Sequence, residues 1–266
     1  MRQASRVLRS QRFHYIAADL AEEGNAARVI AETTAWNNGK APDIVWCIAG
    51  SSYPNLFIDT PLSIMREQMN INYWSCADMA HGILKEWLSP TSTLKGSEKH
   101  LIFTSSAAAF VSVAGYAPYS PAKAAIKSLS DALVQEVVLY GDDVKVHTVF
   151  PGGISSPGFE NENLTKPGVT HKLEEPDIAS ILTPDEAAKA AFDGLENGQY
   201  LVSLTLLGSM MRACAWGGSA RNNWLVDTVM TCGLSMAWPF ITRDINGKVR
   251  KYAKEHGHPS TYPERA

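Results

Sequence analysis

The stretch LIFTSSAAAFVSVAGYAPYSPAKAAIK, residues Leu101–Lys127, indicates the fold more clearly than any other part of the chain. It begins inside an apolar run, His100–Thr104, that is typical of a buried strand, and it leads into a helical segment, Pro121–Leu139. The apolar residues of that segment share one helical stripe: Ile126, Leu129, Leu133 and Val137. A strand followed by a one-sided apolar helix is the repeating unit of a parallel sheet covered by helices.

The same alternation continues on both sides of this stretch. Further apolar runs are predicted as strands: Phe13–Ala18, Asp43–Ile48, Val144–Phe150 and Tyr200–Leu204. Segments of helical period lie between them: Glu22–Asn37, Ser63–Leu88 and Pro184–Asn197. Strands that read as continuous hydrophobic runs are expected where both faces of a sheet are covered. The sequence therefore predicts an α/β fold, a doubly wound, Rossmann-like parallel sheet with helices on both faces.

Composition narrows the class of protein. The 266 residues carry a formal net charge of −3 and are 45% hydrophobic. This hydrophobic content excludes a disordered chain, and the near-neutral charge argues against a nucleic-acid partner. The four cysteines form no C-x-x-C pair and no H-E-x-x-H occurs, so we expect neither a disulfide scaffold nor a metal site.

A tyrosine, a lysine and a serine form the candidate catalytic group. Tyr119 and Lys123 stand four residues apart and therefore share one face of the predicted helix. A phenol with a pKa near 10 is a poor acid–base catalyst at neutral pH, and an adjacent ammonium is expected to lower that pKa. Ser106 ends the preceding strand thirteen residues before Tyr119, where its hydroxyl could bind the oxygen atom that Tyr119 protonates.

The C-terminal part of the chain is unusually apolar. Leu201–Gly217 is apolar apart from Arg212, and Trp224–Ile241 is an 18-residue stretch whose only charge is Asp227. A bilayer span needs about 20 apolar residues, so each segment is marginal as a span. Tryptophans and basic residues near the second segment suit a membrane interface: Trp216, Trp224, Trp238, Arg243, Lys248, Arg250, Lys251 and Lys254.

Two interpretations of this tail stay open. It is either a buried helix pair or dimer seam, or an element that dips into a membrane. We predict a Rossmann-like domain over residues 1–204 and a hydrophobic, membrane-associated segment with a basic end over residues 205–266.

These residues together resemble the short-chain dehydrogenase/reductase family, which uses a Ser–Tyr–Lys set on a doubly wound sheet. Further matches follow in order along the chain: Asp19-Leu20, the Ala49-Gly50 half of Cys47-Ile48-Ala49-Gly50, Asn72, and Pro151-Gly152-Gly153-Ile154. The resemblance implies catalytic roles for Ser106, Tyr119, Lys123 and Asn72, the last of which would hold a relay water. It also implies cofactor contacts at Asp19, Leu20, Ala49, Gly50, Tyr119, Lys123, Pro151, Gly152 and Ile154.

One loop resembles a particular branch of that family. SPGFENENLTKP, residues Ser156–Pro167, is similar to the corresponding loop of the 3-ketodihydrosphingosine reductases. This likeness implies NADPH-dependent reduction of the C3 ketone of a long-chain sphingoid base at the endoplasmic reticulum membrane, with the site facing the cytosol. Val113–Pro118 and the loop Ser155–Val169 would wall the substrate slot. A reductase of another lipid, steroid or retinoid carbonyl, and a non-catalytic partner-binding subunit, are the alternatives; a homo-oligomer stays open.

The glycine-rich turn of the family has no counterpart here. Such a turn needs closely spaced glycines so that the backbone can approach a pyrophosphate, and no G-x-G occurs among the 19 glycines. Only 18 residues precede Asp19, and Met1–Ser10 is predicted as the end of a helix. We therefore expect an N-terminally truncated domain that shows no turnover on its own, with its NADPH preference inherited from the family.

Overall fold

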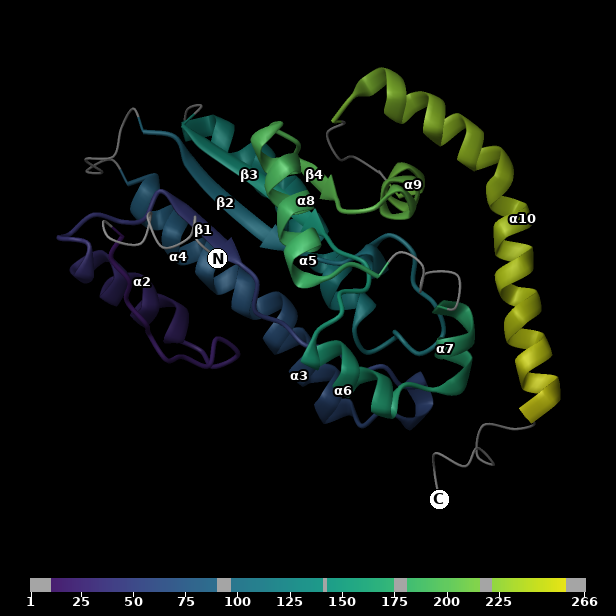
Figure 1. The fold of residues 1–266 in the computed structure, drawn as a ribbon. Coiled ribbons are helices and arrows are strands. Elements are labelled where there is room, and N and C mark those ends of the chain that lie inside the picture. The colour runs from purple at the N-terminus through teal and green to yellow at the C-terminus, as the bar shows by residue number, and fades with distance from the viewer. Residues whose placement is uncertain (1–10, 90–96, 141–142, 175–180, 216–221, 257–266) are drawn as a thin grey trace, which may run out of the picture.

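The computed structural model describes residues 11–89, 97–140, 143–174, 181–215 and 222–256, so the predicted helix end at Met1–Ser10 lies outside it. The fold is a parallel four-stranded sheet of order β1-β2-β3-β4 with helices on both faces (Figure 1). The strands are β1 Ile44–Cys47, β2 Lys99–Thr104, β3 Val144–Phe150 and β4 Leu201–Ser203. Leu101 of β2 pairs with Val45 on one side and with Val146 on the other. The α/β prediction is confirmed.

One face of the sheet carries the larger core. Its helices are α2 Asn25–Trp36, α3 Leu62–Met69, η2 Asn70–Trp74, α4 Ser75–Trp87, α5 Ser120–Glu136 and η4 Val137–Tyr140. Leu101 and Phe103 of β2 point into this core and are fully buried among side chains that include Ile83 of α4 and Ile126 of α5. The predicted stripe of the Pro121–Leu139 segment thus faces the sheet.

The opposite face is covered by α8, Pro184–Glu196. Ile102 of β2 points to this side and joins a second core with Ala191 of α8 and Val202 of β4. α8 begins with a capping box, in which the Thr183 hydroxyl accepts from the Glu186 amide and the Glu186 carboxylate accepts from the Thr183 amide. The alternation of inward side chains along β2 places apolar surface on both faces, as a doubly covered sheet requires.

The prediction of a strand over Phe13–Ala18 is wrong. This segment is not a strand and is largely exposed, because no strand lies beside it in the described part of the chain. It is held instead by α2: the His14 ring stacks on Trp36 with ring centroids 5.4 Å apart, and Arg28 donates to the Ala17 carbonyl at 2.7 Å. The segment therefore follows the surface of a helix without adding to the sheet.

Two short helices follow β3 over the region predicted as a loop. α6 spans Pro157–Thr165 and begins where the Ser156 hydroxyl accepts from the Phe159 amide, and α7 spans Gly168–Glu174. Two further short turns, η1 Phe57–Asp59 and η3 Ala107–Ala109, follow β1 and β2. All four elements therefore come after the carboxyl ends of strands.

The C-terminal region forms two helices that pack on each other, α9 Leu206–Cys214 and α10 Trp224–His256. α10 runs along the outside of the molecule from α9 to α7 and curves along its length (Figure 1), with Pro239 inside it. Its segment Trp224–Ile241 is long and apolar enough to cross a membrane, by length and composition only, and 6% of that segment is buried. The apolar segment of α10 is therefore largely exposed in the single chain, which leaves both interpretations of the tail open, a helix pair or dimer seam and a membrane element.

The two charges inside the apolar segments neutralise each other. Arg212 of α9 donates to Asp227 of α10 at 2.9 Å and to the Leu201 carbonyl of β4 at 3.1 Å. The second oxygen of Asp227 accepts from the Asn223 amide at 3.1 Å. Both side chains are more than nine-tenths buried, so this ion pair fixes the start of α10 to the end of the sheet.

We predict that Asp227→Asn lowers the free energy of unfolding by about 3 kcal/mol, because the buried Arg212 guanidinium loses its counter-charge. Urea unfolding followed by circular dichroism measures this change. Asp244→Asn is the matched control, because it breaks an exposed ion pair with Lys248 on the same helix and should cost less than about 1 kcal/mol. Equal losses in the two variants would contradict the anchoring role of Asp227.

Candidate active site

The carboxyl ends of three neighbouring strands bring the predicted residues together. Ala49-Gly50 follows β1, Ser106 follows β2, and Pro151-Gly152 follows β3. The Ala107 amide donates to the Pro151 carbonyl at 2.8 Å, so the turns after β2 and β3 are joined. In open parallel sheets this edge is where ligands bind.

Ser106 and Tyr119 face each other across this edge. Ser106 caps η3, where its hydroxyl accepts from the Ala108 amide at 3.2 Å, and Tyr119 directly precedes α5. The Ser106 hydroxyl is close enough to the Tyr119 phenol to lower the pKa of Tyr119. A phenol and an alcohol that lie close together can both approach one substrate oxygen. The structure therefore places Ser106 beside Tyr119, and their shared catalytic role stays a prediction.

Lys123 lies one helical turn further along α5, as predicted. It is buried, and its Nζ donates to the Thr104 carbonyl at 3.1 Å and lies 5.6 Å from the centroid of the Tyr119 ring. Burial lowers the pKa of Lys123 to about 8. The backbone holds this amine in place, and no carboxylate among the described residues forms an ion pair with it.

Asn72 is fully buried in the π-helical turn η2, a kind of distortion that is frequent at functional sites. Its amide oxygen accepts from the Ser51 amide at 3.2 Å, and its amide nitrogen donates to the Ser51 and Gln68 carbonyls at 2.9 Å. A methyl group on Gly50 would lie 2.6 Å from the Asn72 oxygen and 3.2 Å from the Lys123 nitrogen. Gly50 is thus required for the close approach of Asn72 and Lys123.

The expected lowering of the Tyr119 pKa by Lys123 is not found. Burial raises the pKa of Tyr119, the hydrogen bond with Ser106 lowers it by less, and the negative charge of Glu162 raises it further. The phenol is therefore protonated at neutral pH. A protonated phenol suits the donation of a proton to an oxyanion, which is the step that a ketone reduction needs.

The residues at this edge of the sheet are suited to bind one half of a dinucleotide. Lys123, Asn72, Gly50 and Pro151-Gly152 gather at one edge, and a methyl group on Gly152 would meet open space. Asp19 and Leu20 lie at the start of α2, where Asp19 is exposed and accepts from the Ala21 amide at 3.0 Å.

Among the residues that the structure describes, no hydrogen bond or ion pair joins Asp19 or Leu20 to Ser106, Tyr119 or Lys123. Ile154 bridges to Leu182 beyond the Pro-Gly turn. The structure therefore brings together the residues predicted for the reacting half of a cofactor, and it leaves Asp19 and Leu20 apart.

A second group beside Tyr119 was missed at the sequence level. The Tyr116 ring lies beside that of Tyr119 with ring centroids 5.8 Å apart and the rings tilted by 50°. The Tyr116 hydroxyl lies 2.7 Å from a Glu162 oxygen and 2.5 Å from a Glu174 oxygen. The only sequence signal was the spacing of Glu162 and Lys166, four residues apart on α6. That spacing predicts an exposed ion pair and gives no hint of a buried one.

Two cysteines also lie near the buried lysine. A hydrogen bond with Cys47 lowers the pKa of the buried Cys76, and the Lys123 charge adds to this effect, whereas the same bond and burial raise the pKa of Cys47. The Cys76 thiol and the Lys123 amine are therefore close enough for each to shift the pKa of the other.

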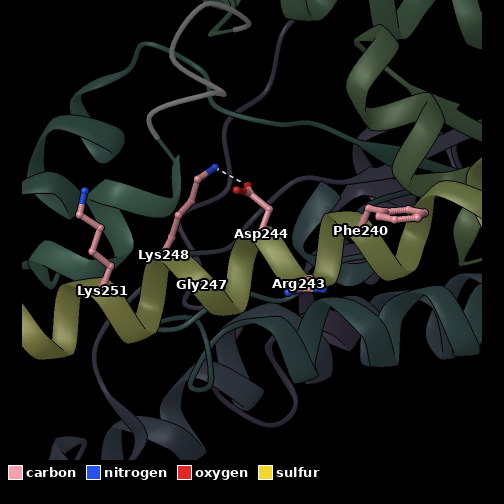
Figure 2. Close-up of a pocket in the computed structure, with 6 residues that line it drawn as sticks. All are labelled: Phe240, Arg243, Asp244, Gly247, Lys248 and Lys251. Atoms are coloured by element: carbon pink, nitrogen blue, oxygen red, sulfur yellow. Dashed lines mark ion pairs between the residues drawn. The ribbon is translucent and has the colours of Figure 1, made fainter.

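A hollow in the surface lies elsewhere, along α10 (Figure 2). Its lining residues all belong to that helix: Phe240, Arg243, Asp244, Gly247, Lys248 and Lys251. Lys248 pairs with Asp244 at 2.7 Å across it. None of the predicted catalytic or cofactor-binding residues lines this hollow, so it is a feature of the outer helix and not of the candidate active site.

The chain is similar to known proteins over most of its length. The family described as short chain dehydrogenase matches residues 1–167. The chain is 45% identical over 269 residues to 3-ketodihydrosphingosine reductase gsl-3 of Neurospora crassa, a match that covers 100% of this chain and 74% of that protein. It is 37% identical over 237 residues to 3-ketodihydrosphingosine reductase TSC10 of Cryptococcus neoformans var. neoformans, covering 89% and 68% of the two chains.

Solved structures share the fold at low sequence identity. A short-chain dehydrogenase from Streptomyces avermitilis superposes with a TM-score of 0.60 at 20% identity, covering 91% of this chain and 84% of that one. A short-chain dehydrogenase from Burkholderia cenocepacia in complex with NADP gives a TM-score of 0.58 at 18% identity, covering 75% and 72%. These likenesses concern the fold alone.

We predict that the stability of the protein contains a contribution from Lys123 that rises with pH between about 8 and 10. The folded-state pKa of Lys123 is about 8, below the ordinary value of 10.5, so in this window the unfolded chain binds more protons than the folded chain. As pH rises, this proton binding no longer favours the unfolded chain, and the free energy of unfolding increases. Urea unfolding at several pH values, compared with Lys123→Met, measures the difference. A difference that stays constant or falls between pH 8 and 10 would contradict the lowered pKa.

Proposed function

The chain belongs to the short-chain dehydrogenase family, and on this premise we propose that it reduces the C3 ketone of 3-ketodihydrosphingosine to dihydrosphingosine with NADPH. The observation that carries the proposal is the group of Ser106, Tyr119 and Lys123, in which the Lys123 amine lies 5.6 Å from the Tyr119 ring and the Ser106 hydroxyl is near enough to lower the Tyr119 pKa. The whole of this chain is 45% identical to the Neurospora crassa reductase, of which the match covers 74%. NADPH, when bound, supplies a hydride to the carbonyl carbon. The protein must supply the proton and stabilise the oxygen.

Tyr119 is the proposed proton donor. Its raised pKa keeps the phenol protonated at neutral pH, so it can transfer its proton to the oxygen of the reduced carbonyl. Ser106 donates a hydrogen bond to the same oxygen while negative charge develops there; loss of such a donor costs roughly 3–4 kcal/mol in other enzymes. Lys123 would bind the nicotinamide ribose, because its amine is held at the sheet edge by the Thr104 carbonyl.

Asn72 is the proposed holder of a relay water near Lys123. The side-chain oxygen of Asn72 accepts a hydrogen bond from the Ser51 amide. The same oxygen would lie 2.6 Å from a methyl group placed on Gly50, so it lies directly against the Gly50 backbone. Gly50 and Pro151-Gly152 would let the nicotinamide approach the backbone, and Asp19 and Leu20 would meet the adenine end. These assignments make the sheet edge a nicotinamide site.

We further propose that residues 205–266 attach the protein to the endoplasmic reticulum membrane with the active site facing the cytosol. The first half of α10 exposes large apolar side chains: Trp224, Leu225, Val226, Val229, Met236 and Phe240. Basic residues follow on the same helix: Arg243, Lys248, Lys251 and Lys254. The buried pair of Arg212 and Asp227 holds the start of α10 against the sheet, which favours a helix that lies in the interface over one that crosses the bilayer.

Turnover tests the proposed reaction. The chain is fused behind a strand, glycine-rich turn and helix of the family, which supplies the G-x-G that the 266 residues lack. NADPH oxidation and product mass are followed with 3-ketodihydrosphingosine and with a steroid ketone. We expect dihydrosphingosine from the first and no product from the second. Reduction of the steroid ketone alone would overturn the proposed substrate.

We predict that Tyr119→Phe in this fusion lowers kcat by at least about 100-fold, because the phenylalanine carries no proton to donate. The matched control is Tyr140→Phe, which removes the hydroxyl of an exposed tyrosine beyond α5 and should leave kcat unchanged. Retained turnover in Tyr119→Phe, with thermal melts showing both variants folded, would refute the role of Tyr119 as proton donor.

We predict that Val229→Glu reduces binding of the chain to phosphatidylcholine–phosphatidylinositol vesicles about tenfold, because an apolar contact with the membrane is replaced by a charge. Vesicle flotation measures the bound fraction. Val138→Glu is the matched control, since both valines are about equally exposed, 65% and 61%, and Val138 lies away from α10. Equal loss in both variants would contradict attachment through α10, and protection of the C-terminal tail from protease in sealed microsomes would contradict the cytosolic orientation.

A further inference from the structure

The two helices α6 and α7 are joined beside Tyr119 by one buried charged cluster. The Lys166 amine lies 2.9 Å from a Glu162 oxygen and 2.6 Å from a Glu174 oxygen, and the Lys166 side chain is fully buried. The amine also lies 5.0 Å from the centroid of the Phe159 ring and 5.7 Å from that of Tyr116. The lysine is thus enclosed by two carboxylates and two aromatic rings.

This cluster is fixed to the segment that ends in Tyr119. Tyr116 lies within hydrogen-bond distance of both carboxylates, and its ring lies beside that of Tyr119. Gly115 adopts a φ of 99°, and a methyl group there would overlap the Thr170 side chain, whose hydroxyl donates to the Ala114 carbonyl at 2.9 Å. The α6–α7 unit therefore lies directly against the Tyr119 segment.

The cluster carries a net charge of −1. Glu162 and Glu174 bring two carboxylates, Lys166 brings one ammonium, and burial together with those carboxylates raises the pKa of Tyr116, which stays neutral. Glu174 uses one oxygen for Tyr116 and the other for Lys166. Both contacts of the Glu162 carboxylate involve Oε1, and no hydrogen bond among the described residues involves its Oε2. The unused acceptor is therefore on Glu162, whose side chain is 13% exposed.

We propose that Glu162 binds the ammonium group of the sphingoid ketone and thereby selects an amino ketone over other lipid ketones. This inference rests on the proposed function and deepens it. In 3-ketodihydrosphingosine the carbon that carries the amine is bonded directly to the carbonyl carbon. When Tyr119 and Ser106 bind the carbonyl oxygen, the ammonium must therefore lie within a few ångströms of them. Tyr116, whose ring lies beside Tyr119, holds the Glu162 carboxylate in the same region. Steroid and retinoid ketones have no such charge to pair with Glu162.

The electrostatics of Tyr119 are consistent with this placement. The charge of Glu162 is close enough to raise the Tyr119 pKa, so the two groups interact across the site. An ammonium bound at Glu162 offsets that charge and makes the phenol a readier proton donor. The correct substrate would then contribute to its own reduction through a group that is not itself reduced.

The inference is tested by binding, which needs no turnover. Isothermal titration calorimetry with the 266-residue chain compares a short-chain 2-amino-1-hydroxy-3-ketone with the same ketone in which hydrogen replaces the amine. We expect the wild-type chain to bind the amino ketone at least about tenfold more tightly, as a charge-assisted hydrogen bond predicts. In Glu162→Gln that ratio should fall to about one.

Glu174→Gln is the matched control. It removes the same charge from the same cluster, and in each variant Lys166 keeps one carboxylate partner, so both are expected to fold. We expect Glu174→Gln to keep the amino-ketone preference within about twofold of the wild-type ratio. Thermal melts of both variants confirm that they are compared as folded proteins.

The outcomes separate this inference from the proposed function. If the wild-type chain binds both ketones equally, or if the two glutamine variants lose the preference equally, the assignment to Glu162 is overturned while reduction by the fused chain can still be observed. If the wild-type chain binds neither ketone and the fused chain does not reduce 3-ketodihydrosphingosine, both proposals fail together.

Discussion

The geometry of the site depends on one buried amine. Lys123 is held under the carboxyl end of the sheet by a single backbone carbonyl, that of Thr104, and burial has already lowered its pKa to about 8. Keeping an amine in such a place costs stability, because a desolvated charge is unfavourable unless it is well compensated. Gly50 has no side chain, which leaves room for the Asn72 oxygen and the Lys123 amine to approach its backbone.

Two oppositely charged groups lie near Tyr119 on different elements. The Lys123 amine, on the helix that follows Tyr119, lies 5.6 Å from the centroid of its ring, and the Glu162 carboxylate on α6 is close enough to raise its pKa. In the structure burial and Glu162 have the larger effect, and the phenol keeps its proton. A tyrosine that must give up a proton to an oxyanion is best held in this state until substrate arrives. The lysine then serves mainly to position groups, because it does not lower the Tyr119 pKa here.

Much of the fold and the reacting residues could be predicted from the sequence, because periodicity and spacing are local properties. Strand β3, Val144–Phe150, matches its predicted bounds, and Tyr119 and Lys123 fall on one helix face as their spacing requires. Phe13–Ala18 failed because an apolar run becomes a strand only where another strand lies beside it. The cluster around Lys166 could not be foreseen either, because its members are polar residues on three separate elements that only the tertiary fold brings together.

The C-terminal helices show why hydropathy alone does not reveal the structural role of a charged residue in an apolar segment. Arg212 and Asp227 each counted against a membrane span in the sequence, yet in the structure they satisfy one another and secure α10 to the sheet. α10 then extends to α7, where a methyl group on Gly168 would overlap the Tyr252 hydroxyl. The helix with the exposed apolar side chains therefore contacts the unit that carries Glu162 and Glu174. The exposed apolar side chains lie in the first half of α10, and the contact with α7 lies near its end at Tyr252, so this one helix joins the edge of the sheet at β4 to the unit that carries Glu162 and Glu174.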